Sequence, residues 1–112
     1  MGTNGAVRYV KIWIELLPVD EGGRRTPLDL STEWPVAYRP QLRVRGGHGR
    51  LLDVEFVAGP PEPIAPGGAG AHATIRLPSN NGTSHAELVA GAEFDVLEGP
   101  RIIGHGRVTS RS

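Results

Sequence analysis

The stretch Val7-Arg-Tyr-Val-Lys-Ile-Trp-Ile-Glu-Leu-Leu17 alternates apolar and polar residues over most of its length. The apolar set is Val10, Ile12, Ile14 and Leu16, and the intervening set is Tyr9, Lys11, Trp13 and Glu15. Successive side chains of an extended chain point to opposite sides, so this alternation indicates a β-strand with one buried face. We therefore expect one long strand from Val7 to Leu17.

The same alternation returns in five further places along the chain. These are Leu42 to Val44, Leu52 to Phe56, Ala73 to Leu77, Glu93 to Leu97 and Arg101 to Ser110. In the last two stretches the residues expected on one side are Phe94, Val96, Ile102 and Val108. Each stretch has the length and the period of a short strand, so the sequence predicts six strands in all.

Segments rich in glycine and proline separate the predicted strands. They are Pro18 to Pro27, Arg45 to Gly49, Ala58 to Gly70 and Glu98 to Pro100. Both residue types favour turns, so we expect each segment to be an exposed loop or a tight turn. The run His85 to Val89 fits either a helical turn or irregular chain, and both readings stay open.

The length and the composition indicate one globular domain. The chain has 112 residues, of which 38% are apolar, 16 are Gly and 10 are Pro. Six strands without a helix protect their edges by closing into a barrel or by packing as a sandwich. Gly104 and Gly106 favour the barrel, because glycine relieves crowding where strands bend or cross closely. We predict an all-β, six-stranded antiparallel barrel over residues 7–112, after a flexible segment at residues 1–6.

Several classes of function are disfavoured by what the sequence contains. Without cysteine the chain forms no disulfide, and its four histidines lie in separate segments, so we expect no metal and no cofactor. No Gly-x-Ser-x-Gly segment or comparable arrangement presents a nucleophile, so we expect no catalytic residue. Twelve basic and twelve acidic residues cancel, so no DNA partner is expected. The absence of a long apolar run and of a signal segment predicts a cytoplasmic protein without a membrane partner.

Three segments resemble parts of one known domain, in the same order and with similar spacing. They are Asp20-Glu-Gly-Gly-Arg-Arg-Thr-Pro27, Tyr38-Arg-Pro-Gln41 and Phe94-Asp-Val-Leu-Glu-Gly-Pro-Arg-Ile-Ile-Gly-His-Gly106. All three are similar to the third, C-terminal barrel domain of elongation factor Tu. The resemblance runs from about Val7 to Thr109, and it implies a six-stranded antiparallel barrel.

The resemblance also implies which surfaces bind partners. In that family the barrel contacts the T-stem backbone of aminoacyl-tRNA, the GTPase domain and the nucleotide-exchange factor, and none of these contacts is catalytic. The tRNA-facing positions that carry over are Gln41, Glu98 and Gly99, whereas Pro100 stands where the family has a second glycine. The chain has no Gly-x4-Gly-Lys-[Ser/Thr] segment, so the resemblance implies no GTPase activity.

Four arginines and one glutamine gather around one expected hairpin, and we call this set the Arg stripe. Its members are Arg39, Gln41, Arg43, Arg45 and Arg50. Alternation along a strand aligns Gln41, Arg43 and Arg45 on one face with a spacing of about 6 to 7 Å, close to that of successive phosphates. The alternative is that the arginines pair with Asp53 and Glu55 across the hairpin.

The sequence therefore predicts a non-enzymatic module that binds a protein partner, with tRNA binding through the RNA backbone as the alternative. The candidate binding residues are the Arg stripe together with Glu98, Gly99 and Arg101. In the loop after the first strand, the further candidates are Glu21, Arg24 and Arg25. The partner itself is not identified by these residues.

Overall fold

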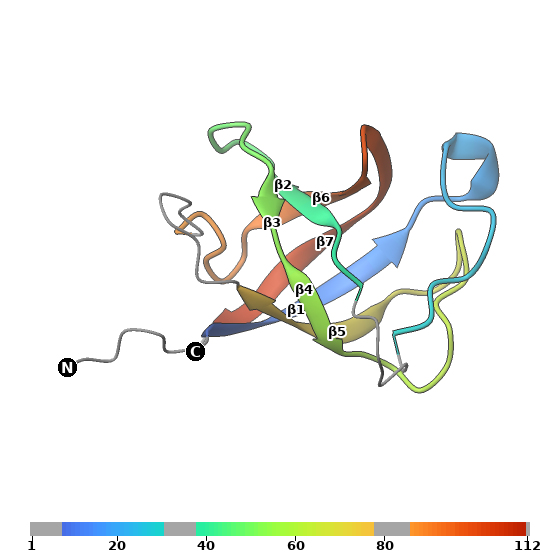
Figure 1. The fold of residues 1–112 in the computed structure, drawn as a ribbon, viewed down its shortest axis with the longest axis horizontal. Helices are drawn as coiled ribbons and strands as arrows, with labels where there is room; N and C mark the ends of the chain where they lie inside the picture. The colour runs from blue at the N-terminus through green and yellow to red at the C-terminus, as the bar shows by residue number, and fades with distance from the viewer. Residues whose placement is uncertain (1–7, 31–37, 78–85, 112) are drawn as a thin grey trace.

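The computed structural model describes residues 8–30, 38–77 and 86–111, and within them the chain is all-β (Figure 1). The strands are β1 (Arg8–Leu16), β2 (Gln41–Val44), β3 (Leu52–Asp53), β4 (Glu55–Ala58), β5 (Ala71–Leu77), β6 (Glu93–Glu98) and β7 (Arg101–Arg111). One short 3-10 turn, η1 (Val19–Glu21), follows β1. In the described ranges no helix has the length and apolar character needed to cross a membrane. The segment predicted to be flexible, residues 1–6, falls outside the described residues.

The strands form one antiparallel sheet that closes on itself. Its order is β3-β2-β6-β7-β1-β5-β4, and β3 and β4, at the two ends of this order, belong to one continuous stretch of chain. Through this stretch, β3 pairs with β2 on one side and β4 pairs with β5 on the other. The predicted all-β barrel is therefore confirmed.

The strand predicted from Leu52 to Phe56 is interrupted, and this is why the structure has seven strands instead of six. Val54 lies opposite Pro40, and the Val54 N–H donates to the Pro40 carbonyl over 3.5 Å. Because proline has no N–H, Pro40 cannot donate a hydrogen bond to the Val54 carbonyl. Strand pairing is therefore weak at this point. Beyond it the pairing resumes, with the Phe56 N–H donating to the Tyr38 carbonyl over 2.8 Å.

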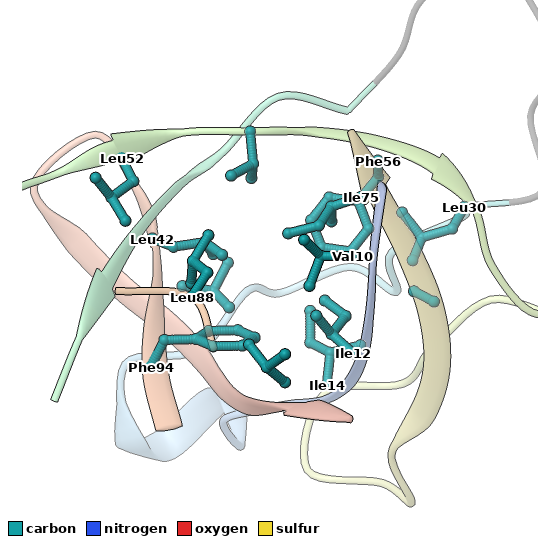
Figure 2. Close-up of a cluster of buried hydrophobic side chains, with 14 of the residues drawn as sticks. Val10, Ile12, Ile14, Leu30, Leu42, Leu52, Phe56, Ile75, Leu88 and Phe94 are labelled. Carbon is teal, nitrogen blue, oxygen red and sulfur yellow. The ribbon is translucent and has the colours of Figure 1, made fainter. Parts of the chain in front are cut away.

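The inward-facing residues of the strands fill the barrel with apolar side chains (Figure 2). The alternation in β1 buries Val10, Ile12 and Ile14 completely. From the opposite wall Leu42 and Phe94 are also fully buried. The interior is therefore a packed core, as expected for a small barrel.

Strands β1 and β7 approach each other closely at two glycines. A Cβ atom at Gly106 would lie 2.2 Å from the Trp13 carbonyl oxygen, and one at Gly104 would lie 2.5 Å from the Glu15 carbonyl oxygen. No side chain fits at either position without a backbone shift. The two glycines therefore have the packing role that the sequence predicted for them.

At one position of the β6–β7 hairpin, the residue that faces the core is not the one predicted. Ile103 is fully buried and Ile102 is 37% exposed, whereas the alternation predicted Ile102 in the core. Val96 pairs with Gly104 and Leu97 pairs with Ile102, so Ile103 is an extra residue in β7. Such a bulge reverses the side on which the following residues lie, and sequence period alone does not reveal it.

The run His85 to Val89, left open by the sequence, contains no helix in its described part. Residues 86–91 form turns between the chain after β5 and the start of β6. Leu88 is fully buried and reaches the core, whereas Val89 is 53% exposed. The irregular reading is therefore the one that the structure supports for residues 86–89.

Candidate functional site

Arg24, Tyr38 and Glu98 come from segments far apart in the chain and meet at one end of the barrel. The Tyr38 hydroxyl donates a hydrogen bond to Glu98 Oε2 over 2.6 Å. The Arg24 guanidinium forms an ion pair with the same oxygen, and its Cζ lies 6.0 Å from the centroid of the Tyr38 ring. One carboxylate thus joins the loop after β1, the chain before β2 and the end of β6.

A second set of contacts ties the loop after β1 to the β6–β7 turn. The Arg101 guanidinium donates to the carbonyls of Gly22 and Gly23 over 2.8 and 3.1 Å. The Leu17 N–H donates to the Ile103 carbonyl over 2.9 Å. We call residues 18–26 together with residues 98–103 the loop end, and Figure 1 shows η1 and the β6–β7 turn on the same side of the barrel.

Tyr38 is packed as well as hydrogen bonded. Its ring lies against the Phe56 ring, with 5.3 Å between the centroids. Burial raises the pKa of Tyr38 well above its usual value, and the hydrogen bond to the Glu98 carboxylate raises it further. The phenol therefore stays neutral and serves as a fixed hydrogen-bond donor. Its role at this junction is structural.

The predicted residues of the loop end divide into anchors and exposed groups. Arg24 and Glu98 are half-buried, because their side chains are 23% and 32% exposed. In contrast, Glu21, Arg25 and Gly99 are exposed. The loop end thus presents charged side chains at its surface, and the half-buried pair of Arg24 and Glu98 holds its backbone in place.

The loop end also exposes apolar side chains. Val19 is 51% exposed and Ile102 is 37% exposed. Val19 belongs to η1, and Ile102 directly follows Arg101, which donates to the loop that begins with η1. Apolar and charged groups therefore share this end of the barrel.

Most members of the Arg stripe contact acidic side chains. Gln41 donates to Asp53 over 2.9 Å, and Arg39 forms an ion pair with Glu55 at 3.2 Å. These two contacts lie across the hairpin, as the alternative reading of the stripe expected. Arg45 pairs at 2.9 Å with a residue on another strand, Asp95 of β6. Among residues 8–30, 38–77 and 86–111, Arg43 and Arg50 form no ion pair.

From the sequence, Glu55 was expected to pair with an arginine of the Arg stripe. In the structure it is the centre of a small ionic cluster. It is only 7% exposed, and it also contacts Arg76 on β5. A buried carboxylate needs such partners, because an unpaired buried charge is costly. Arg76 and Asp95 escaped sequence reasoning because cross-strand neighbours depend on the order of strands in the sheet.

The histidines and acidic residues do not converge in the described part of the chain. His105 Nε2 lies 3.0 Å from Glu15 Oε1, and His48 Nε2 lies 3.8 Å from Glu87 Oε2. Within the three described ranges, no three histidine or carboxylate side chains gather in a way that could hold a metal ion.

Comparison with known proteins adds no assignment. A scan against protein-family models gave no match, and a search of curated proteins also gave none. The resemblance to the third domain of elongation factor Tu thus stays a prediction from the residues quoted above.

Proposed function

We propose that this chain is a non-catalytic, cytoplasmic binding module that uses its loop end to contact a protein, as the resemblance to the elongation factor Tu barrel implies. The observation that carries this proposal is the junction at Glu98. Arg24 and Tyr38 meet there on one carboxylate, and Arg101 holds the same loop by its carbonyls. These contacts fix the loop after β1, which is rich in turn-forming residues and lies mostly outside the core.

A fixed loop favours binding because little conformational entropy is lost when a partner docks. Ordering a flexible loop on association weakens affinity, and a loop that is already held avoids this cost. Protein interfaces combine apolar side chains with a charged rim. Val19 and Ile102 supply the apolar part at the loop end, and Glu21 and Arg25 supply charges of both signs.

RNA-backbone binding through the Arg stripe is the second candidate. Arg43 and Arg50 favour it, because within the described residues neither guanidinium is engaged by a carboxylate. Arg39 and Arg45 argue against it, since their charges are offset by Glu55 and Asp95. Charge neutralisation within the stripe leaves a mixed surface, which suits a protein partner better than a polyanion.

The test is affinity capture from the native lysate with two matched double variants. The first carries Glu21→Ala and Arg25→Ala at the loop end. The control carries Glu62→Ala and Arg107→Ala, which remove the same charges from exposed positions elsewhere. We expect one protein to be captured with and without nuclease, lost with the first variant and retained with the control.

Two outcomes would overturn the assignment. Equal capture by both double variants would show that the loop end is not the binding surface. Capture that disappears with nuclease would favour the RNA candidate, which further requires that Arg43→Ala weakens tRNA binding and lowers its salt dependence.

A further inference from the structure

A hollow in the outer wall of the barrel is separate from both surfaces discussed above. It has a volume of about 520 Å³ and lies over β1, β5, β7 and the end of β4. Its described lining consists of Lys11, Ala58, Gly59, His72, Ala73, Thr74 and Thr109. Within this described lining one residue is a lysine, one is a histidine, two carry hydroxyls, three are small, and none is acidic.

Lys11 is the charged group of the hollow, and its charge is not offset nearby. It lies in the middle of β1, opposite Thr74 of β5. Within the described residues Lys11 forms no ion pair, whereas Arg24, Arg39, Arg45 and Arg76 each pair with a carboxylate. Lys11 is exposed, so its ammonium group is accessible to an anion that enters the hollow from solvent.

Two neighbouring side chains can add hydrogen bonds to a bound anion. The Thr74 hydroxyl lies beside Lys11 in the register, and His72 lies two residues before it on the same face of β5. The His72 ring is held by an edge contact to Trp13, with 4.9 Å between centroids and 72° between planes. The Thr109 hydroxyl donates to the Lys11 carbonyl over 2.9 Å, so it is not counted among the donors to an anion.

The floor of the hollow is made by small residues on fixed backbone. Gly59 packs so closely that a Cβ atom there would lie 2.5 Å from Leu30 Cβ. The pairing of β4 with β5 shifts register between Phe56 and Ala58, which bends the wall next to Thr74. Ala58 is exposed, and its small side chain leaves space in the hollow.

We propose that this hollow binds the phosphate group of a small organic phosphate monoester. Lysine binds phosphate as a compact point charge that presents three donors. The volume falls within the usual size range of small-molecule sites. It exceeds what a phosphate group alone fills, so the organic part of the ligand has room beside the small residues.

The experiment is a titration of ¹⁵N-labelled protein, followed by amide chemical shifts, with ribose 5-phosphate, inorganic phosphate and ribose. We expect saturable shifts at Lys11, Gly59 and Thr74 with both phosphates, tighter binding of ribose 5-phosphate, and no shift with ribose. Lys11→Ala should weaken binding about tenfold or more, because it removes a charge-assisted contact. Thr74→Val should weaken it by a smaller factor.

Arg107→Ala is the matched control, because Arg107 is an exposed cation of β7 outside the lining of the hollow. It should bind as the unchanged protein does. The proposal is overturned if no saturable shift occurs with either phosphate. It is equally overturned if Arg107→Ala weakens binding as much as Lys11→Ala, since phosphate would then respond only to net charge.

Discussion

At the scale of single residues, Glu98 connects segments that are far apart in the chain. Its carboxylate accepts from Tyr38 and pairs with Arg24 in a half-buried setting. Hydrogen bonds to ionised groups are stronger than neutral ones, and partial burial reduces the competition from water. A single acidic side chain can therefore hold the loop after β1 and the chain before β2 against the end of β6.

Tyr38 makes the stability of the protein sensitive to alkaline pH. Burial and Glu98 raise its folded-state pKa, so the neutral phenol is favoured in the folded protein. Its contribution to the free energy of unfolding is full below the unfolded pKa of about 10, and it is lost as pH rises above that value. Tyr38→Phe should therefore show a shallower loss of stability above pH of about 10.

Urea unfolding measured from neutral to alkaline pH checks this prediction. Tyr9→Phe is the matched control, because Tyr9 is 44% exposed, and it should follow the unchanged protein. If the pH profiles of Tyr38→Phe and the unchanged protein are parallel in the alkaline range, the phenol is not held as described.

Sequence reasoning identified several residues of the junction but not their contacts. Arg24 was a candidate because it lies in the exposed loop after the first strand, and Glu98 because the resemblance places it among the tRNA-facing positions. Tyr38 was quoted only as part of a segment, although it is the hydrogen-bond donor that completes the junction. Its partner lies 60 positions away in the chain. Such a pair depends on the three-dimensional arrangement of loops, which local patterns do not specify.

At the scale of elements, the β1–β7 pair depends on the absence of side chains at two positions. A Cβ atom at Gly106 would meet the Trp13 carbonyl at 2.2 Å and the Phe94 ring at 2.8 Å. Both neighbours are held, one as backbone and the other as a fully buried ring. Added atoms in such a site force the strands apart.

Gly106→Ala should therefore lower the free energy of unfolding by about 3 kcal/mol, the upper part of the usual range for overpacking. Gly68→Ala is the control, because its closest contact would be 3.3 Å from Ala65 in an exposed loop. The control should change stability by less than about 1 kcal/mol. Urea unfolding midpoints measure both, and equal effects of the two substitutions would contradict the close approach of β1 and β7.

Strand positions were predictable from the period of apolar residues, but the irregularities within strands were not. The strand β1 could be predicted because apolar residues alternate with outward-facing residues over most of its length. The break at Val54 depends on Pro40 lying opposite, and the burial of Ile103 depends on a bulge next to Val96. Each irregularity is set by the neighbouring strand, so it appears only when the pairing partners are known.

At the scale of the whole molecule, barrel closure separates the apolar core from the polar outer wall. The stretch from Leu52 to Ala58 joins both ends of the strand order, which leaves the core enclosed and the polar side chains outside. The loop end, the Arg stripe and the hollow over Lys11 are all parts of this outer wall. If the sheet were open, its edge strands would be available for pairing, and the contact of Arg39 with Glu55 of β4 would be lost.

Nuclear Overhauser effects between backbone protons test the closure most directly. In one sample of the folded protein we expect cross-strand contacts from Gln41 to Asp53 and from Phe56 to Ile75, which together show the same stretch paired on both sides. Contacts on only one of these two sides would mean an open sheet and would contradict the closed barrel.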